Sequence, residues 1–380
     1  MFARYPPAFR RLILGIAALT AIWFVWGRFL LVAAINHQVG GDFGQYWLAA
    51  ARFARGGSLY LETFLRDPIP AQAAAYLYPP AFAQLLAPLT GLPASVACAA
   101  FAVLSLAIFV VTTWKCAQAG GARGGVDLAL GTALLLAAAF PVAFAVIFGN
   151  VEALLVAAIT VALVARPSRG GLALALAVVL KVAPFALVPA LASRSRLGLL
   201  AFCLALLAVV VVGIVLAPET WVAFPSILAH LAASGSDYPQ NFAPAAVVAT
   251  LAGPTAGSIV RIITLAVAGA LVLLSALLAR RPGGWPAALF AATFASLLVP
   301  ATLWLHYPAI LLPFIAFAWP RASTRTRLGI VYSLLFFDFW DMAAGVIGAV
   351  GLVLLGAVLL RSLWPVTGPP IVNDPTGTLQ

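Results

Sequence analysis

The sequence predicts an all-α, polytopic membrane protein, and three observations support this class. Of the 380 residues, 64% are apolar and only 8% are charged, whereas a soluble domain carries about 25% charged residues. The mean hydropathy is +1.11, and the apolar runs are spread along almost the whole chain. These runs are continuous and do not alternate with polar residues, which favours membrane helices over a β-barrel.

The first membrane helix is expected at residues 12–35. This apolar run follows Arg4, Arg10 and Arg11, and it is longer than the roughly 7–15 apolar residues of a cleaved signal peptide. Further apolar segments bring the expected total to about 10–12 transmembrane or re-entrant helices. They lie at 93–116, 127–148, 151–165, 198–217, 259–279, 286–302, 304–319, 328–340 and 343–361.

Two other apolar segments are irregular. Segment 79–91 begins with Pro79-Pro80 and is too short to cross a bilayer of about 30 Å as a helix. Segment 170–192 contains Lys181 and Pro184 near its middle. A charge and a proline in those positions predict a broken helix or a re-entrant pair.

The basic residues predict the orientation, because they are enriched in cytoplasmic loops. This rule places both termini inside and the loops 36–78 and 218–258 outside, provided that segment 170–192 enters the membrane and returns. We therefore expect one membrane domain, 1–364, followed by a disordered cytoplasmic tail, 365–380, which is rich in Pro, Gly and Thr. The inside clusters are Arg4/Arg10/Arg11, Lys115/Arg123, Arg166/Arg169, Arg194/Arg196, Arg280/Arg281, Arg321/Arg325/Arg327 and Arg361.

A net charge of +11 would suggest nucleic-acid binding in a soluble protein. Here the arginines lie mainly in short loops between apolar runs, so the charge indicates topology and contact with lipid headgroups. We expect no nucleic-acid partner.

The first outer loop contains a predicted amphipathic helix on the outer leaflet, with aromatic residues at headgroup depth. Asp42 lies at its N-terminal end, and two interpretations of Asp42 stay open. It is either an ordinary helix cap worth about 1 kcal/mol, or a functional carboxylate at the membrane surface, with Gly40 and Gly41 letting a substrate approach. The apolar stripe consists of Phe43, Tyr46, Trp47, Ala50 and Ala54.

Several motifs then occur in the order in which they are found in glycosyltransferase family 87, and the chain resembles that family. They are Gly41-Asp42-Phe43-x-x-Tyr46, Tyr78-Pro79-Pro80-x-Phe82, Gly149-Asn150-x-Glu152-x-Leu154-Leu155, Lys181-x-x-Pro184 and Trp304-x-His306-Tyr307. The third motif departs from the family's usual amides, because Asn150 and Glu152 stand there. The resemblance implies a GT-C-like fold and a mannosyltransferase that uses polyprenyl-phosphate sugars.

A lipid-phosphate sugar already carries a stable leaving group, so one base suffices to deprotonate the acceptor hydroxyl. On the resemblance, Asp42 is the expected base. Lys181, His306 and Arg28, with Tyr46, would bind the donor phosphate or sugar, and Asn150, Glu152 and Tyr78 would contact the sugar or acceptor. No metal site and no cofactor are expected, because no Asp-x-Asp motif occurs. The alternatives are that Lys181 and Arg28 extend to headgroups and that His306 is a structural histidine.

The expected activity is an inverting transfer of a hexose, with mannose as the expected sugar, from a polyprenyl phosphate to a lipid or glycan acceptor. The site would face the periplasm or cell exterior from the cell (inner) membrane, and its partners would be donor, acceptor and membrane lipids. A secondary transporter of an amphipathic or anionic solute is the main alternative, although halves 1–190 and 191–380 show no convincing repeat. A glycan ligase or polymerase is a third possibility, because it shares lipid-phosphate donors.

Overall fold

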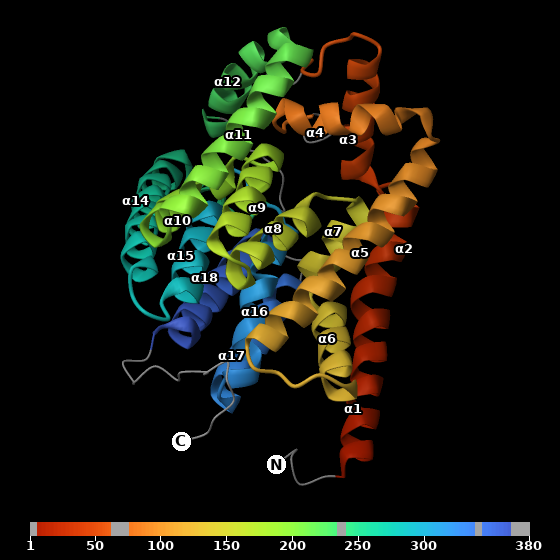
Figure 1. The fold of residues 1–380 in the computed structure, drawn as a ribbon. Helices are drawn as coiled ribbons and strands as arrows, with labels where there is room; N and C mark the ends of the chain where they lie inside the picture. Colours follow the sequence, from red (N-terminus) through yellow and green to blue (C-terminus); the bar gives the residue numbers. More distant parts are fainter. Residues whose placement is uncertain (1–5, 62–75, 234–240, 339–343, 366–380) are drawn as a thin grey trace.

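The computed structural model describes residues 6–61, 76–233, 241–338 and 344–365 (Figure 1). These residues form helices and no strand, which confirms the all-α prediction. Five helical stretches are long and apolar enough to cross a membrane, so the chain is a polytopic membrane protein, and one bent helix pair would make a sixth. The five are α1–α2 (Pro7–Ala21 and Arg28–Ile35, joined by a π-helical turn, Ile22–Gly27), α5 (Ala94–Ala119), α11 (Arg196–Leu216), α14 (Pro254–Ala279) and α18 (Ala344–Leu363).

The other helices are shorter. The bent pair is α6 (Val126–Ala138) and α7 (Phe140–Phe148), whose axes differ by 73°. The remaining ones are α3 (Gly41–Ala54), α4 (Pro80–Leu86), α8 (Glu152–Val164), α9 (Pro167–Leu180), α10 (Val188–Arg194), α12 (Pro218–Ala233), α13 (Pro244–Ala252), α15 (Trp285–Leu298), α16 (Leu312–Ala318) and α17 (Thr324–Leu335). Short 3-10 turns lie at Ala87–Gly91, Ala183–Leu187, Tyr307–Leu311, Trp319–Arg321 and Phe336–Asp338.

Long and short helices have different surroundings. The long helices expose large apolar side chains, such as Leu104 on α5, Val215 on α11 and Ile262 on α14, as expected for surfaces that face lipid. The short helices α8, α15 and α16 lie in the middle of the bundle (Figure 1) and are largely buried. Protein therefore covers most of the surface of these short helices.

Glycines let the central helices approach closely. A Cβ on Gly171 of α9 would collide with the backbone of Gly198 in α11, and a Cβ on Gly170 would lie 3.2 Å from Cα of Ala162 in α8. Such small-residue contacts are typical of membrane helix pairs, because packing and not water exclusion drives their association. They hold α9 between α8 and α11.

Segment 170–192 is broken where the sequence predicts. α9 ends at Leu180, Lys181 is extended (φ −154°, ψ 127°), and a 3-10 turn leads into α10. At the end of α10, the guanidinium of Arg194 lies 3.5 Å from the carbonyl oxygen of Ala162 and 4.0 Å from the ring centre of Trp285. Because Ala162 is near the end of α8, the chain returns to the end of the bundle that it left at residue 164.

Several of the predicted basic clusters meet at this end. Arg11 forms an ion pair with Asp127 at the start of α6 (2.9 Å), and Arg321 donates to the carbonyl of Ala119 at the end of α5 (3.3 Å). Cys116, one turn before that end, lies 3.5 Å from Thr160 of α8. The placement of these clusters on the cytoplasmic side of the membrane stays a prediction.

The predicted helix of the first outer loop is present as α3, but its aromatic stripe does not face the headgroups. Phe43 and Trp47 are 3% and 7% exposed, and Tyr46 is fully buried. Phe43 packs against Phe101 of α5 (5.2 Å between ring centres), and Tyr46 packs against Phe82 of α4 (5.0 Å). The expectation of surface anchors was wrong, because protein and not lipid covers this apolar face.

Candidate active site

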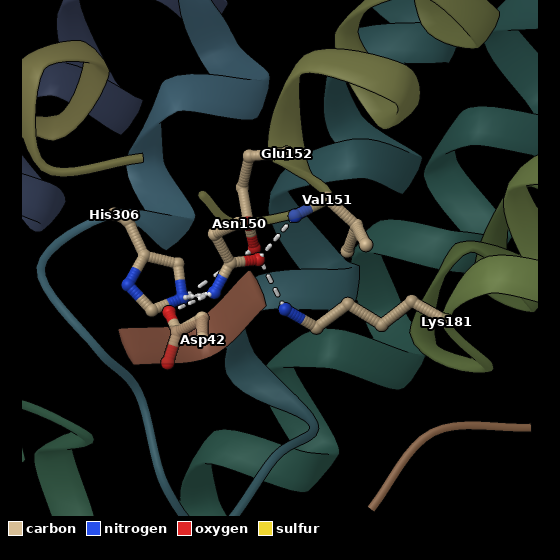
Figure 2. Close-up of polar contacts among 6 residues, drawn as sticks. All are labelled: Asp42, Asn150, Val151, Glu152, Lys181 and His306. Atoms are coloured by element: carbon tan, nitrogen blue, oxygen red, sulfur yellow. Dashed lines mark hydrogen bonds and ion pairs between the residues drawn. The ribbon is translucent and has the colours of Figure 1, made fainter. Parts of the chain in front are cut away.

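Five of the polar residues singled out from the sequence meet where helices start or break. Asp42 is the second residue of α3, Asn150 lies between α7 and α8, and Glu152 begins α8. Lys181 follows α9, and His306 precedes the 3-10 turn at Tyr307–Leu311. Figure 2 shows their side chains directed toward one another. Distant parts of the chain thus build one polar cluster inside an apolar bundle.

Two glycines with a left-handed backbone conformation, Gly40 and Gly149, determine the position of Asp42 at the start of α3. Gly40 has φ +70° and is the residue before the helix, and a Cβ there would lie 2.5 Å from Sγ of Cys98. Gly149 also has φ +70°, and a Cβ there would lie 2.7 Å from Cβ of Phe43. Only glycine fits these two positions without strain. Since Gly40 occupies the cap position and no side chain caps α3, the interpretation of Asp42 as an ordinary helix cap is wrong.

Asn150 is the centre of the hydrogen-bond network. Its Oδ1 accepts from the backbone N–H of Val151 (2.6 Å), which fixes the orientation of the amide. Its Nδ2 then donates to Oδ2 of Asp42 (2.6 Å) and lies 2.9 Å from Nε2 of His306. Because Nδ2 is only a donor, Nε2 must accept, and the ring proton is at Nδ1.

The imidazole is therefore neutral. His306 is 4% exposed, and burial lowers its pKa to about 4. Its Nδ1 is buried and has no hydrogen-bond partner among the residues that the structure describes. This N–H is therefore a buried donor whose hydrogen bond is unfilled within the described part of the chain.

Glu152 and Lys181 form a buried ion pair. Glu152 is fully buried, and its Oε1 lies 2.8 Å from Nζ of Lys181 and 3.7 Å from Nε2 of His306. Nζ of Lys181 also lies 3.3 Å from the ring centre of Tyr307, a cation–π contact. A cavity of about 20 Å³, room for one water molecule, borders Glu152, Lys181 and Tyr307. The ammonium is held in place by a carboxylate and an aromatic face.

A group of tyrosines adjoins the cluster. The ring centre of Tyr78 lies 4.9 Å from that of Tyr46 and 6.0 Å from Nζ of Lys181. Tyr60 donates to the carbonyl of Tyr78 (2.8 Å), and Tyr76 donates to that of Pro79 (2.6 Å). The structure therefore brings the predicted Tyr46 and Tyr78 to the same site and shows what fixes the Tyr-Pro-Pro segment.

Arg28 is connected to the site less directly. Its side chain, at the start of α2, is exposed. The ring of the next residue, Phe29, stacks on Phe144 (5.1 Å between centres), which in turn lies 5.2 Å from the ring of His306. The role of Arg28 in donor binding stays a prediction.

Sequence reasoning did not assign roles to three residues that shape this site: Tyr307, Tyr76 and Asn241. Tyr307 is the last residue of the late motif, so its position next to His306 was an available signal. Asn241 joins the loop before His306 through contacts across 60 and 62 residues. No spacing in the sequence indicates a contact of that range.

The family comparison gives a match to glycosyltransferase family 87 over residues 76–308, more than half of the chain. The matched region includes Tyr78, Asn150, Glu152, Lys181 and His306, and Asp42 precedes it. Searches among curated proteins and among solved structures found no match. The match favours an enzyme over the transporter alternative. The chain belongs to glycosyltransferase family 87 and is a membrane glycosyltransferase.

Proposed function

We propose that this protein transfers a hexose, with mannose as the expected sugar, from a polyprenyl phosphate to a hydroxyl of a lipid or glycan, with inversion at the anomeric carbon. The observation that carries the proposal is the carboxylate of Asp42, held by Asn150 beside a neutral histidine and a paired lysine. One base and a set of phosphate-binding donors are the groups that such a displacement requires.

Asp42 acts as the base. It is half-buried, and burial raises its pKa to about 6, while the hydrogen bond from Asn150 opposes that rise. A carboxylate with this pKa is ionised at pH 7 and is a better proton acceptor than an ordinary aspartate. It removes the acceptor's hydroxyl proton as that oxygen attacks the anomeric carbon, and the bond to the phosphate oxygen breaks.

Lys181 and His306 hold the departing phosphate. Lys181 has three N–H donors, one directed to Glu152, so others can reach a phosphate oxygen. The Nδ1–H of His306, which points away from Lys181 (Figure 2), is a second donor that the proposed substrate could use. Metal chemistry is not required in this scheme, because these fixed donors stabilise the negative charge that develops on the leaving group.

The lipid part of a substrate would lie against an apolar cavity of about 320 Å³ between α4, α9 and α11. Its lining includes Val179, two residues before Lys181, and Ala81, three residues after Tyr78. The remaining lining residues are Gln84, Leu85, Leu176, Ala208, Val209, Val212, Gly213 and Leu216. Polar donors next to an apolar groove suit an amphipathic, lipid-linked sugar.

We further propose that the site faces the periplasm or the cell exterior. The site lies at the end of α9 opposite to Arg166 and Arg169, and the positive-inside rule assigns such arginines to the cytoplasm. Both termini would then be cytoplasmic in the cell (inner) membrane. Residues 1–364 would act as one domain, and the tail beyond 365 lies outside the described residues.

The test is sugar transfer by the purified protein. The assay supplies labelled polyprenyl-phosphate-mannose, a membrane lipid extract and EDTA, and the product is isolated and its anomeric configuration determined by NMR. We expect a single added mannose of inverted configuration. Addition of a preassembled chain would indicate a ligase, and retained configuration or strict dependence on Mn²⁺ or Mg²⁺ would contradict the proposed mechanism.

A further inference from the structure

Asn241 joins the outer loop before α13 to the stretch of chain that leads to His306. Its Nδ2 donates to the carbonyl of Ala301 (3.3 Å), and its Oδ1 accepts from the N–H of Leu303 (2.9 Å). The neighbouring N–H of Phe242 donates to the carbonyl of Leu303 (3.1 Å). Three hydrogen bonds therefore connect two segments that are far apart in the sequence.

The stretch needs these bonds because it is not helical and is buried at Leu303, Leu305 and His306. Residues 299–306 lie outside α15 and the following 3-10 turn, so their peptide groups lack the partners that a helix supplies. Leu303 is fully buried, and Leu305 is 3% exposed. Buried peptide groups must be paired, and an asparagine amide offers the same donor and acceptor as a peptide. Asn241 is itself only 4% exposed.

The stretch ends in the candidate active site. His306, three residues after Leu303, lies 2.9 Å from Nδ2 of Asn150, and the ring of Tyr307 lies against Nζ of Lys181. A displacement of the backbone at Leu303 would therefore move the imidazole and the aromatic face together.

We infer that Asn241 is a positioning residue for sugar transfer, which fixes residues 301–305 so that His306 meets Asn150 and Tyr307 meets Lys181. It acts through the backbone of that stretch and not on the substrate. The inference rests on the proposed role of His306 in holding the donor phosphate.

Two variants and one control separate positioning from general stability. Asn241→Asp keeps an acceptor for the N–H of Leu303 but loses the donor to Ala301. In Asn241→Ser the side chain is too short to contact Ala301 or Leu303. This variant is used if the aspartate protein does not fold. The control is Ser275→Ala, because Ser275 is also fully buried but donates within its own helix, to the carbonyl of Val272 (2.6 Å).

The first measurement does not depend on sugar transfer. The chain has three histidines, so NMR of protein with ¹⁵N-labelled imidazoles, assigned with His306→Gln, reports on His306 directly. We expect its ring resonances to move in the Asn241 variants and to stay in place in Ser275→Ala. Unchanged His306 resonances in folded Asn241 variants would overturn the inference, even if the proposed function holds.

The second measurement is a double-mutant cycle on sugar transfer. We expect Asn241→Asp to lower kcat/KM by about 10- to 100-fold, the size of effect that small misplacements of catalytic groups produce. In a His306→Ala background the same change should cost clearly less than in the wild type, because one of the two groups that it positions is gone. An equal loss in both backgrounds would show a merely structural role. If the wild-type protein transfers no sugar at all, the proposed function fails and the NMR result alone decides the role of Asn241.

Discussion

The buried pair of Glu152 and Lys181 predicts an asymmetry between single and double variants. Lys181→Met removes the ammonium that lies 2.8 Å from Oε1 of Glu152, and the Glu152 side chain is fully buried. Leaving a buried carboxylate without its partner typically costs about 3–5 kcal/mol. Because the whole free energy of unfolding of a protein is about 5–15 kcal/mol, we expect a much less stable protein.

The double variant Lys181→Met/Glu152→Gln should regain most of that stability. Replacing both members of a buried ion pair by neutral groups of similar size is often neutral or stabilising. Sugar transfer should nevertheless stay low in the double variant, because Lys181 is proposed to hold the donor phosphate. Stability and activity would then separate. Because Glu152 is itself an expected sugar or acceptor contact, the loss is assigned to Lys181 only if Glu152→Gln alone still transfers sugar.

The assay compares melting temperature and denaturant unfolding of the detergent-purified proteins with their rates of transfer from polyprenyl-phosphate-mannose. Lys115→Met is the matched control, because Lys115 is the chain's other lysine and is exposed on α5, so its loss should change neither quantity. If Lys181→Met melts like the wild type, the electrostatic reasoning about the buried pair is refuted. If the double variant transfers sugar at the wild-type rate, Lys181 does not hold the phosphate.

Three further predictions concern the base and the orientation. Asp42→Asn should fold and bind the donor but lose about 10²–10⁴ in rate, and a folded variant with more than about a tenth of wild-type turnover would rule out Asp42 as the base. The pKa of Asp42 is raised to about 6, and protonation of Asp42 removes the base. We therefore expect kcat/KM to fall as the pH drops below about 6. A kcat/KM that stays constant down to pH 5 would contradict this assignment. Single cysteines at Gly56 and Ser195, in a background without native cysteines, should be labelled by an impermeant reagent from outside and from inside, respectively. Strong outside labelling at position 195 in intact cells would contradict the re-entrant course proposed for segment 170–192.

The sequence was sufficient for the features that have a local cause. The break at Lys181 was predictable, because a charged residue and a nearby proline both disfavour an unbroken membrane helix. The long helices were predictable because uninterrupted apolar runs have few other structures available in a membrane. The residues that gather at the site were identified from motifs, although their contacts were not.

The sequence was insufficient where the surroundings decide the outcome. Phe43, Tyr46 and Trp47 form the same apolar stripe whether lipid or protein covers it, because both environments are apolar. The sequence also left open whether Asp42 caps its helix, which depends on the left-handed conformation of Gly40. The contact of Asn241 with the 301–303 stretch is long-range and has no periodicity.

The charges at the site constrain the geometry of the proposed reaction. The carboxylates of Asp42 and Glu152 face a single ammonium, that of Lys181, and the imidazole of His306 is neutral. An incoming phosphate adds further negative charge, and in a region of low dielectric constant it would be repelled by Asp42. In the proposed reaction the phosphate would therefore bind on the side of Lys181, away from the base. The amide nitrogen of Asn150 contacts both Asp42 and His306, whose side chains adjoin each other (Figure 2). A sugar bound between Asp42 and Lys181 would have the proposed base on one face and the leaving group on the other, which is the arrangement that direct displacement with inversion requires.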